Sequence, residues 1–212
     1  MDNNKRGRFI TFEGVEGGGK SSNIPLVKNL LSDAGIDVVV TREPGGTPLA
    51  EEIRQLILAK RDEHVDDCAE LLLVFAARAQ HFNRLILPAL EAGKWVLCDR
   101  FTDATYAYQG AGRGLAMQTI ALLENLVQGE LRPDLTLLFD LDVATGMARA
   151  RGRGDLDRFE LQELAFFERI RALYLERLKT ESYYRLIDAS KTPIEVGQQV
   201  STAIQKFMGA HQ

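Results

Sequence analysis

A short glycine-rich segment carries the residue types that bind phosphate groups. Residues 14–21 read GVEGGGKS and match the pattern GxxxxGK[ST]. Glycines let such a backbone curl so that its N–H groups point at phosphate oxygens. The ammonium of Lys20 then reaches the β- and γ-phosphates, and the hydroxyl of Ser21 is a ligand for Mg²⁺. We predict that the phosphate chain of a nucleoside triphosphate contacts Gly14, Val15, Glu16, Gly17, Gly18, Gly19, Lys20, Ser21 and Ser22.

Asp99 and Arg100 follow the apolar run 95–98 and place opposite charges side by side. A carboxylate at the end of a strand can hold Mg²⁺ through water, so Asp99 joins Ser21 as a predicted metal ligand. The guanidinium of Arg100 can bridge two phosphoryl groups and neutralise charge during transfer, which predicts a catalytic role. The alternative is an aspartate that caps the next turn, with Arg100 as its partner at the surface.

Four arginines, Arg149, Arg151, Arg153 and Arg158, form the densest basic cluster and are interleaved with glycines. This pattern is typical of a mobile lid, at about 149–160, that closes over phosphates and excludes water. The glycine-rich segment has no arginine of its own. We therefore predict that Arg151, Arg153 and Arg158 are catalytic and that Arg149 binds phosphate. A solvated helix end or a nucleic-acid patch is the alternative, and a net charge of −4 argues against nucleic acid.

Short apolar runs alternate with helical patterns and must position these side chains. We expect strands at 8–13, 38–41, 95–98, 135–141 and 185–188. We expect helices at 20–33, 47–60, 69–91 with a bend near Pro88, 115–128, and from 193 onward, and a polar, aromatic loop around 105–109. Apolar strands that alternate with helices indicate one α/β domain over 1–212, with a parallel sheet covered on both faces. Ligands bind such sheets at the carboxyl ends of the strands, where every motif above lies.

Composition is that of an ordinary globular chain, with 45% hydrophobic and 26% charged residues. The two cysteines, Cys68 and Cys98, do not form a CxxC pair, so we expect two buried free thiols. We find no signal peptide and no apolar segment that approaches a membrane span, so we expect a cytoplasmic protein with neither membrane nor nucleic acid as a partner.

Other nucleotide-binding classes fit less well. A GTPase needs a DxxG after a strand and an NKxD to read guanine, and neither is present. Motors and assembly ATPases need larger chains with coupling domains. A small phosphotransferase remains.

Five segments, in order along the chain, resemble the signature segments of the thymidylate kinase family. They are FEGVEGGGKSS at 12–22, TREPGGTPLAEEIR at 41–54, FAARAQH at 75–81, DRFTDATYAYQGAGRG at 99–114 and RARGRGDLDRFE at 149–160. The resemblance is to the bacterial type with a basic lid. It implies the P-loop nucleoside monophosphate kinase fold with a parallel five-stranded sheet and helices on both faces. It also implies ATP as co-substrate, Mg²⁺, dTMP as acceptor, and a homodimer with 69–91 at its interface.

The resemblance also implies an acceptor site. The Pro-Gly-Gly turn after Arg42 places that arginine near the sheet edge, although a plain strand–helix turn explains the glycines equally well. Phe75 and Arg78 share a helix face, which suits a flat base between a ring and a guanidinium; Val74 stands where the family has its stacking aromatic. The predicted dTMP-binding residues are Glu16, Arg42, Pro44, Phe75, Arg78, Arg100, Thr105, Tyr108 and Gln109.

We therefore expect direct in-line transfer of the ATP γ-phosphoryl group to dTMP, giving dTDP for dTTP synthesis, with no covalent enzyme intermediate. The alternatives are another pyrimidine monophosphate kinase, for CMP or UMP, and a non-catalytic P-loop nucleotide sensor.

Overall fold

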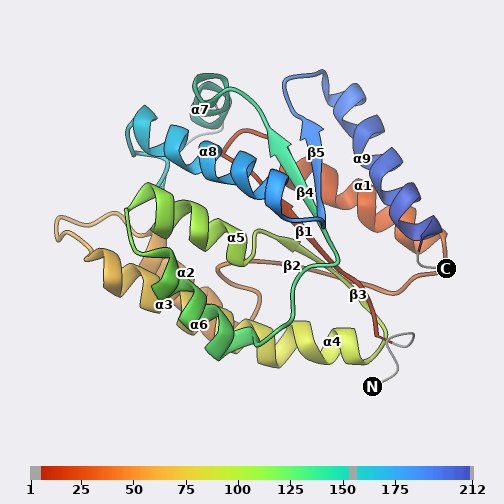
Figure 1. Ribbon diagram of the computed structural model, residues 1–212, viewed down its shortest axis with the longest axis horizontal. Helices are drawn as coiled ribbons and strands as arrows, with labels where there is room; N and C mark the ends of the chain where they lie inside the picture. Colours follow the sequence, from red (N-terminus) through yellow and green to blue (C-terminus); the bar gives the residue numbers. More distant parts are fainter. Residues whose placement is uncertain (1–5, 153–156, 211–212) are drawn as a thin grey trace.

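A parallel five-stranded sheet forms the centre of the protein. The structure, a computed structural model, describes residues 6–152 and 157–210. The strands are β1 (Phe9–Glu13), β2 (Val38–Arg42), β3 (Trp95–Asp99), β4 (Leu135–Asp140) and β5 (Tyr184–Asp188), in the order β2-β3-β1-β4-β5 (Figure 1). This is the α/β sheet that the sequence predicts.

Helices cover both faces of the sheet. On one face α1 (Lys20–Asp33) and α9 (Pro193–Gly209) lie side by side (Figure 1). The other face carries the continuous helical stretch α3 (Asp67–His81), η1 (Phe82–Ile86) and α4 (Leu87–Glu91), together with α8 (Leu164–Thr180). Alternate strand residues serve the two faces: Phe9 packs with Phe82 and Ile86, whereas Ile10 packs in the cluster of Val27 and Leu31.

Local sequence signals begin several helices. Thr47 caps α2 (Pro48–Leu58), and Thr192 forms a capping box with Glu195 at the start of α9. Asp66 caps α3 and Asp142 caps α7 (Val143–Arg151). Each cap satisfies backbone N–H groups that the first turn of a helix leaves without partners. The remaining helices are α5 (Thr102–Thr105), η2 (Tyr106–Gly112) and α6 (Met117–Gln128).

The strand register brings the carboxyl ends of β1, β2 and β3 to one level. Asp99 of β3 is opposite Phe12 of β1 on one side and Arg42 of β2 on the other. The N–H of Arg100 continues this pairing by donating to the carbonyl of Phe12 (3.0 Å), and that of Glu43 donates to Asp99 (3.0 Å). Three segments with predicted roles therefore leave the sheet next to one another.

The helical stretch that the sequence predicts over 69–91 contains a π-helical segment, η1, about one turn before Pro88. Pro88 has no N–H to donate to the carbonyl of Arg84, and its ring crowds that carbonyl. A wider turn just before the proline accommodates both effects without breaking the helix.

The segment around 105–109 is helical, and the expectation of a loop is wrong. Thr102 to Gly112 form α5 and η2, which are largely buried. The polar side chains that suggested a loop find buried partners instead: Thr102 donates to Gln128 (2.6 Å) and Tyr106 donates to Glu124 (2.6 Å). Because their hydrogen bonds are satisfied, these residues can lie in a packed helix.

Only one of the two thiols is buried. Cys98 lies in the central sheet, whereas Cys68 is exposed because it occupies the outer side of the first turn of α3. The expectation of two buried cysteines is therefore wrong for Cys68. Among the described residues, no helix combines the length and apolar character needed to cross a bilayer.

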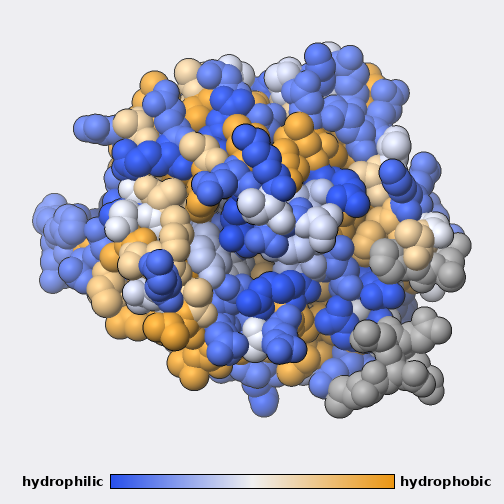
Figure 2. Space-filling view, viewed as in Figure 1, coloured by the Kyte–Doolittle hydropathy of each residue, from blue (hydrophilic) through white to orange (hydrophobic). Residues whose placement is uncertain are grey.

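Hydrophobic side chains gather at the lower left of the face in Figure 2, over α3 and α6. Leu122 and Leu126 of α6 are 72% and 79% exposed, and Leu72 of α3 is 52% exposed. We call these three residues the leucine patch. Exposed apolar side chains grouped in this way are typical of a contact surface.

Candidate active site

Residues 14–19 form a tight loop between β1 and α1. Gly14, Gly17 and Gly19 have φ angles of 127°, 75° and 84°, a region that favours glycine. At Gly17 there is also no room for a side chain, because an added Cβ would lie 2.2 Å from the carbonyl oxygen of Gly146 in α7. The loop therefore has the curled backbone that phosphate binding requires, and it abuts the helix that leads towards residue 153.

The side-chain ammonium of Lys20 lies against this loop. Its side chain is 6% exposed, and its Nζ donates to the carbonyls of Gly14 and Val15, both at 2.9 Å. Burial and the nearby charge of Arg100 lower the pKa of Lys20 to about 8. A bound anion would add negative charge next to this ammonium and stabilise its charged form.

Ser21 and Asp99 lie together at the start of α1 and the end of β3. The Ser21 hydroxyl donates to Asp99 Oδ2 at 3.0 Å. No group of three or more His, Cys, Asp or Glu side chains suited to a metal occurs within the residues described. Two oxygen ligands fit Mg²⁺, which keeps several waters and takes its other ligands from substrate phosphates.

Arg100 stands in a strained backbone conformation at the centre of the site. It is the described non-glycine residue with a positive φ, 67°, a conformation that persists only where surrounding contacts fix it. Its guanidinium donates to the Gly14 carbonyl (2.9 Å), forms an ion pair with Glu16 and lies 4.9 Å from the ring centre of Tyr108. Burial opposes its charge, but the carboxylate of Glu16 outweighs that effect and raises the pKa of Arg100.

Glu13 supports this strained turn from within the core. It is fully buried and accepts hydrogen bonds from the Phe101 N–H and the Tyr174 hydroxyl, both at 2.7 Å. Burial, followed by the charge of Asp103, raises the pKa of Glu13 to about 7.

Arg78 of α3 is 2% exposed and held on several sides. Its Nε donates to Glu43 (2.7 Å), and its Nη2 donates to the carbonyl of Phe101 (3.2 Å) and the hydroxyl of Thr105 (2.9 Å). Glu43 is in turn bound by His81 (2.9 Å). Burial opposes the charge of Glu43, but Arg78 outweighs it and lowers the pKa of this carboxyl. Arg78 Nη1 has no hydrogen-bond partner within the described part of the chain, so a ligand carbonyl would satisfy it.

A cavity of about 360 Å³ connects these groups. The basic side chains among its lining residues are Lys20, Arg42, Arg54, Arg78 and Arg100. Its apolar and aromatic lining includes Pro44, Ile57, Leu58, Val74, Phe101, Ala104, Tyr108 and Phe159. Several cations beside a partly apolar wall suit a molecule that has both phosphate groups and a flat ring.

Comparison with known proteins gives a consistent result. The sequence model of the thymidylate kinase family matches residues 12–200. The chain belongs to the thymidylate kinase family. It is 58% identical to the thymidylate kinase of Teredinibacter turnerae, over 95% of this chain and 99% of that protein. It is 59% identical to the one of Pseudomonas putida, over 92% of this chain and 95% of that protein. The crystal structure of thymidylate kinase from Ehrlichia chaffeensis superposes with a TM-score of 0.76 at 32% identity, covering 96% of this chain and 99% of the other.

Most of the predicted site residues line the cavity of about 360 Å³. The predicted residues that line it are Glu16, Gly17, Gly18, Gly19, Lys20, Ser21, Ser22, Arg42, Pro44, Arg78, Asp99, Arg100, Thr105, Tyr108 and Gln109. Gly14 and Val15 contribute carbonyls that accept from Lys20.

Phe75 does not line the cavity, which disagrees with its predicted contact with a base. Its ring packs against Leu71, Tyr106 and Ile120, and Arg78 lies 4.8 Å from the ring centre. Val74 lines the cavity instead. Residues 74 and 75 are about 100° apart around a helix, so only one of them faces the ligand side.

The arginines of the predicted lid are spread out. Arg149 and Arg151 lie in the last turn of α7, where Arg149 donates to the carbonyl of Ala189 (2.9 Å). Arg151 lies beside Glu16 of the P-loop, in a small pocket that both residues line. Arg153 lies outside the described residues. Arg158 is not among the lining residues, because its guanidinium binds Glu70 (2.6 Å).

Sequence reasoning missed several lining residues. Glu43, Arg54, Asp157, Phe159 and Glu160 all face the cavity. Arg54 carried a usable signal: it lies one helical turn after Glu51, which binds Arg42 (2.8 Å) at the same edge. Glu43 follows Arg42 and Asp157 precedes Arg158 in the sequence, so each acidic residue could have been predicted at the site from its arginine neighbour.

Proposed function

We propose that the cavity holds ATP and dTMP with their phosphate groups facing each other, and that the protein transfers the γ-phosphoryl group between them. One observation carries the proposal. Arg100 contacts the P-loop, and the carbonyl of the next residue, Phe101, accepts from Nη2 of Arg78, whose Nη1 remains without a partner among the described residues. The segment of Arg100 and Phe101 thus positions both a guanidinium for the transferred phosphoryl group and, through Arg78, a hydrogen-bond donor for the base.

The donor side is the P-loop. Its backbone and Lys20 bind the phosphates of ATP, with Arg149 as a further contact. Ser21 and Asp99 would hold Mg²⁺, and the ion would supply positive charge that offsets the charge of the phosphates. Arg151 and Arg153 supply the remaining positive charge, since the P-loop has no arginine. Arg158 is bound to Glu70, so it positions the neighbouring residues of the cavity rim and does not contact the transferred phosphoryl group.

The acceptor side lies between α2, α3 and η2. Arg42, Pro44 and Arg100 bind the phosphate of dTMP, and Tyr108 and Glu16 lie beside its sugar. Arg78, Thr105 and Gln109 read the base, for which Val74 supplies an apolar wall. The acceptor phosphate is already a nucleophile, so the chain orients it, excludes water and stabilises charge.

We further propose a homodimer in the cytoplasm, built on a single kinase domain over residues 1–212. The leucine patch on α3 and α6 supports self-association, because three exposed leucines gain by burial against a second copy.

Measurement of ADP release with ATP and Mg²⁺ tests the function, with dTMP, dUMP, dCMP, UMP, dGMP and AMP compared as acceptors. We expect the highest kcat/KM with dTMP. Faster turnover with dCMP or UMP would instead favour another pyrimidine monophosphate kinase. Tight ATP binding without turnover of any acceptor would favour a nucleotide sensor.

A further inference from the structure

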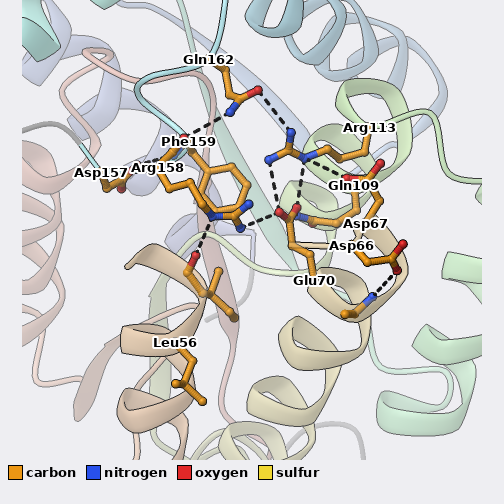
Figure 3. Close-up of polar contacts among 12 residues, drawn as sticks. Leu56, Asp66, Asp67, Glu70, Gln109, Arg113, Asp157, Arg158, Phe159 and Gln162 are labelled. Carbon is orange, nitrogen blue, oxygen red and sulfur yellow. Dashed lines mark hydrogen bonds and ion pairs between the residues drawn. The ribbon is translucent and has the colours of Figure 1, made fainter. Parts of the chain in front are cut away.

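A buried carboxylate outside the cavity connects two parts of the site. Glu70 of α3 has no exposed surface. Figure 3 shows Arg158, Arg113 and Gln109 converging on it. All three are donors, so the Glu70 side chain accepts each of these hydrogen bonds through its carboxylate oxygens.

The first connection runs to the rim of the cavity. Arg158 Nη2 donates to Glu70 Oε2 at 2.6 Å, and its Nε donates to the carbonyl of Ile57 at 3.0 Å. The neighbours of Arg158 in the chain, Asp157 and Phe159, line the cavity. The Arg158–Glu70 pair therefore fixes the segment that holds the side chains of Asp157 and Phe159 at the cavity wall.

The second connection runs to Gln109 on η2. Its Nε2 donates to Glu70 Oε1 at 2.7 Å, and Gln109 also lines the cavity. A carboxylate cannot donate, so it must receive the NH₂ end of the amide, and the amide oxygen is left for the ligand. The amide oxygen of Gln109 would accept a hydrogen bond from N3–H of thymine. It would repel N3 of cytosine, which is itself an acceptor.

Arg113 completes the arrangement. It donates to both oxygens of Glu70, at 3.4 and 3.2 Å, and to Gln162 at 3.2 Å. Gln162 donates back to the carbonyl of Arg158 at 3.3 Å. A buried carboxylate needs such a set of donors, and losing one donor weakens the hold on the others.

We propose that Glu70 is a positioning residue that fixes the amide orientation of Gln109 for thymine and ties it to the cavity rim through Arg158. The inference rests on the proposed function, since it assumes that Gln109 faces the base of a pyrimidine monophosphate. Glu70 acts only through these two neighbours and does not touch the ligand.

A double-mutant cycle tests the connection to Gln109. The variants are E70Q, Q109A and the pair, and the quantity measured is the ratio of kcat/KM for dTMP to that for dCMP. E70Q frees the amide to turn, and we expect the ratio to fall about tenfold, the equivalent of one hydrogen bond. In the Q109A background we expect E70Q to change the ratio by less than about twofold.

Tryptic cleavage after Arg158 tests the connection to the rim. Trypsin must take the Arg158 side chain into its own pocket, so the pair with Glu70 has to open first. We expect E70Q to raise the rate of this cleavage about tenfold. Glu124→Gln is the matched control, because Glu124 is a buried carboxylate bound by Tyr106 and Arg132 and does not line the cavity. It should leave the selectivity ratio and the cleavage rate unchanged.

The inference is overturned if E70Q lowers turnover of dTMP and dCMP equally, or changes their ratio to the same extent with and without Gln109. It is also overturned if cleavage after Arg158 stays at the wild-type rate. Should E70Q show no cooperative thermal unfolding, R158Q replaces it in the cycle, with the same Gln109-dependent loss of selectivity expected. If the wild-type protein does not use dTMP, the proposed function fails, while the cleavage experiment still tests the link between Glu70 and Arg158.

Discussion

At the scale of single residues, the site depends on side chains whose charges are fixed by buried partners. Arg78 shows this most clearly, since Glu43, Phe101 and Thr105 hold three of its sides. The planar guanidinium fits this arrangement, and the ammonium of a lysine does not.

We expect Arg78→Lys to lower kcat/KM for dTMP about 100-fold, mainly through KM, because the donor to the base is lost and Glu43 keeps a poorer partner. Steady-state kinetics with varied dTMP measure the change. Arg84→Lys, at an exposed arginine of η1, is the control and should stay within about twofold of wild type. A wild-type KM in R78K would contradict a role in binding the acceptor.

Glu13 predicts a pH dependence of stability. Its pKa in the folded protein is about 7, raised from 4.5 by burial. The folded state therefore binds the proton more tightly than the unfolded state. This stabilisation is complete below the unfolded pKa and is lost as the pH rises through 7.

We expect the free energy of unfolding of the wild type to fall between pH 5 and 8 by up to about 3 kcal/mol more than that of Glu13→Gln. The amide can still accept from the Phe101 N–H, and the Tyr174 hydroxyl can reverse its role. Urea unfolding across this pH range measures the difference. Parallel curves for the two proteins would contradict the assignment.

At the scale of elements, the P-loop and α7 are in direct backbone contact. Gly17 has both a positive φ and no space for a Cβ, because Gly146 is adjacent. Gly35 has the same φ, 75°, with nothing within 4 Å of an added Cβ. The two positions separate the effect of backbone conformation from that of crowding.

We expect Gly17→Ala to lower the free energy of unfolding by about 3 kcal/mol and to reduce kcat/KM for ATP at least 100-fold, because loop and helix must move apart. Gly35→Ala should cost about 1 kcal/mol, from backbone conformation alone, and leave kinetics unchanged. Thermal unfolding and ATP kinetics on both variants check this. Equal effects would mean that the contact with α7 does not matter.

Elements were predictable from sequence where one local pattern determines them. Each of the five strands is built around a short apolar run, and the P-loop lies between one of these strands and a helix. The polar pattern around 105–109 predicts a loop, but the segment is helical because the polar side chains of α5 and η2 are satisfied by Glu70, Glu124 and Gln128, which lie elsewhere in the sequence. No local pattern reports such distant partners.

The same limit applies to the candidate site. Arg78, Thr105 and Gln109 could be predicted from short segments, and they line the cavity. Whether Val74 or Phe75 faces the ligand depends on the rotation of α3 against its neighbours, which spacing within one helix does not determine. The role of Glu70 needed the positions of three separate segments.

At the scale of the whole molecule, the leucine patch predicts association. We expect Leu126→Asp to convert a dimer to a monomer in analytical ultracentrifugation, because burial of a charge within an apolar contact costs several kcal/mol. Ile194→Asp, at a 75% exposed residue on α9, is the control and should remain a dimer. A dimer in both variants would place the interface elsewhere.

The buried lysine of the P-loop has a chemical consequence. An amine with a pKa of about 8 is uncharged in about a tenth of molecules at pH 7, far more than an ordinary lysine. We therefore expect Lys20 to react as a nucleophile near neutral pH, so that amine-reactive acylating reagents small enough to enter the cavity modify it ahead of exposed lysines. Phosphates bound in the loop raise its pKa and suppress the reaction. Covalent labelling at Lys20 thus becomes a measure of how fully the nucleotide site is filled.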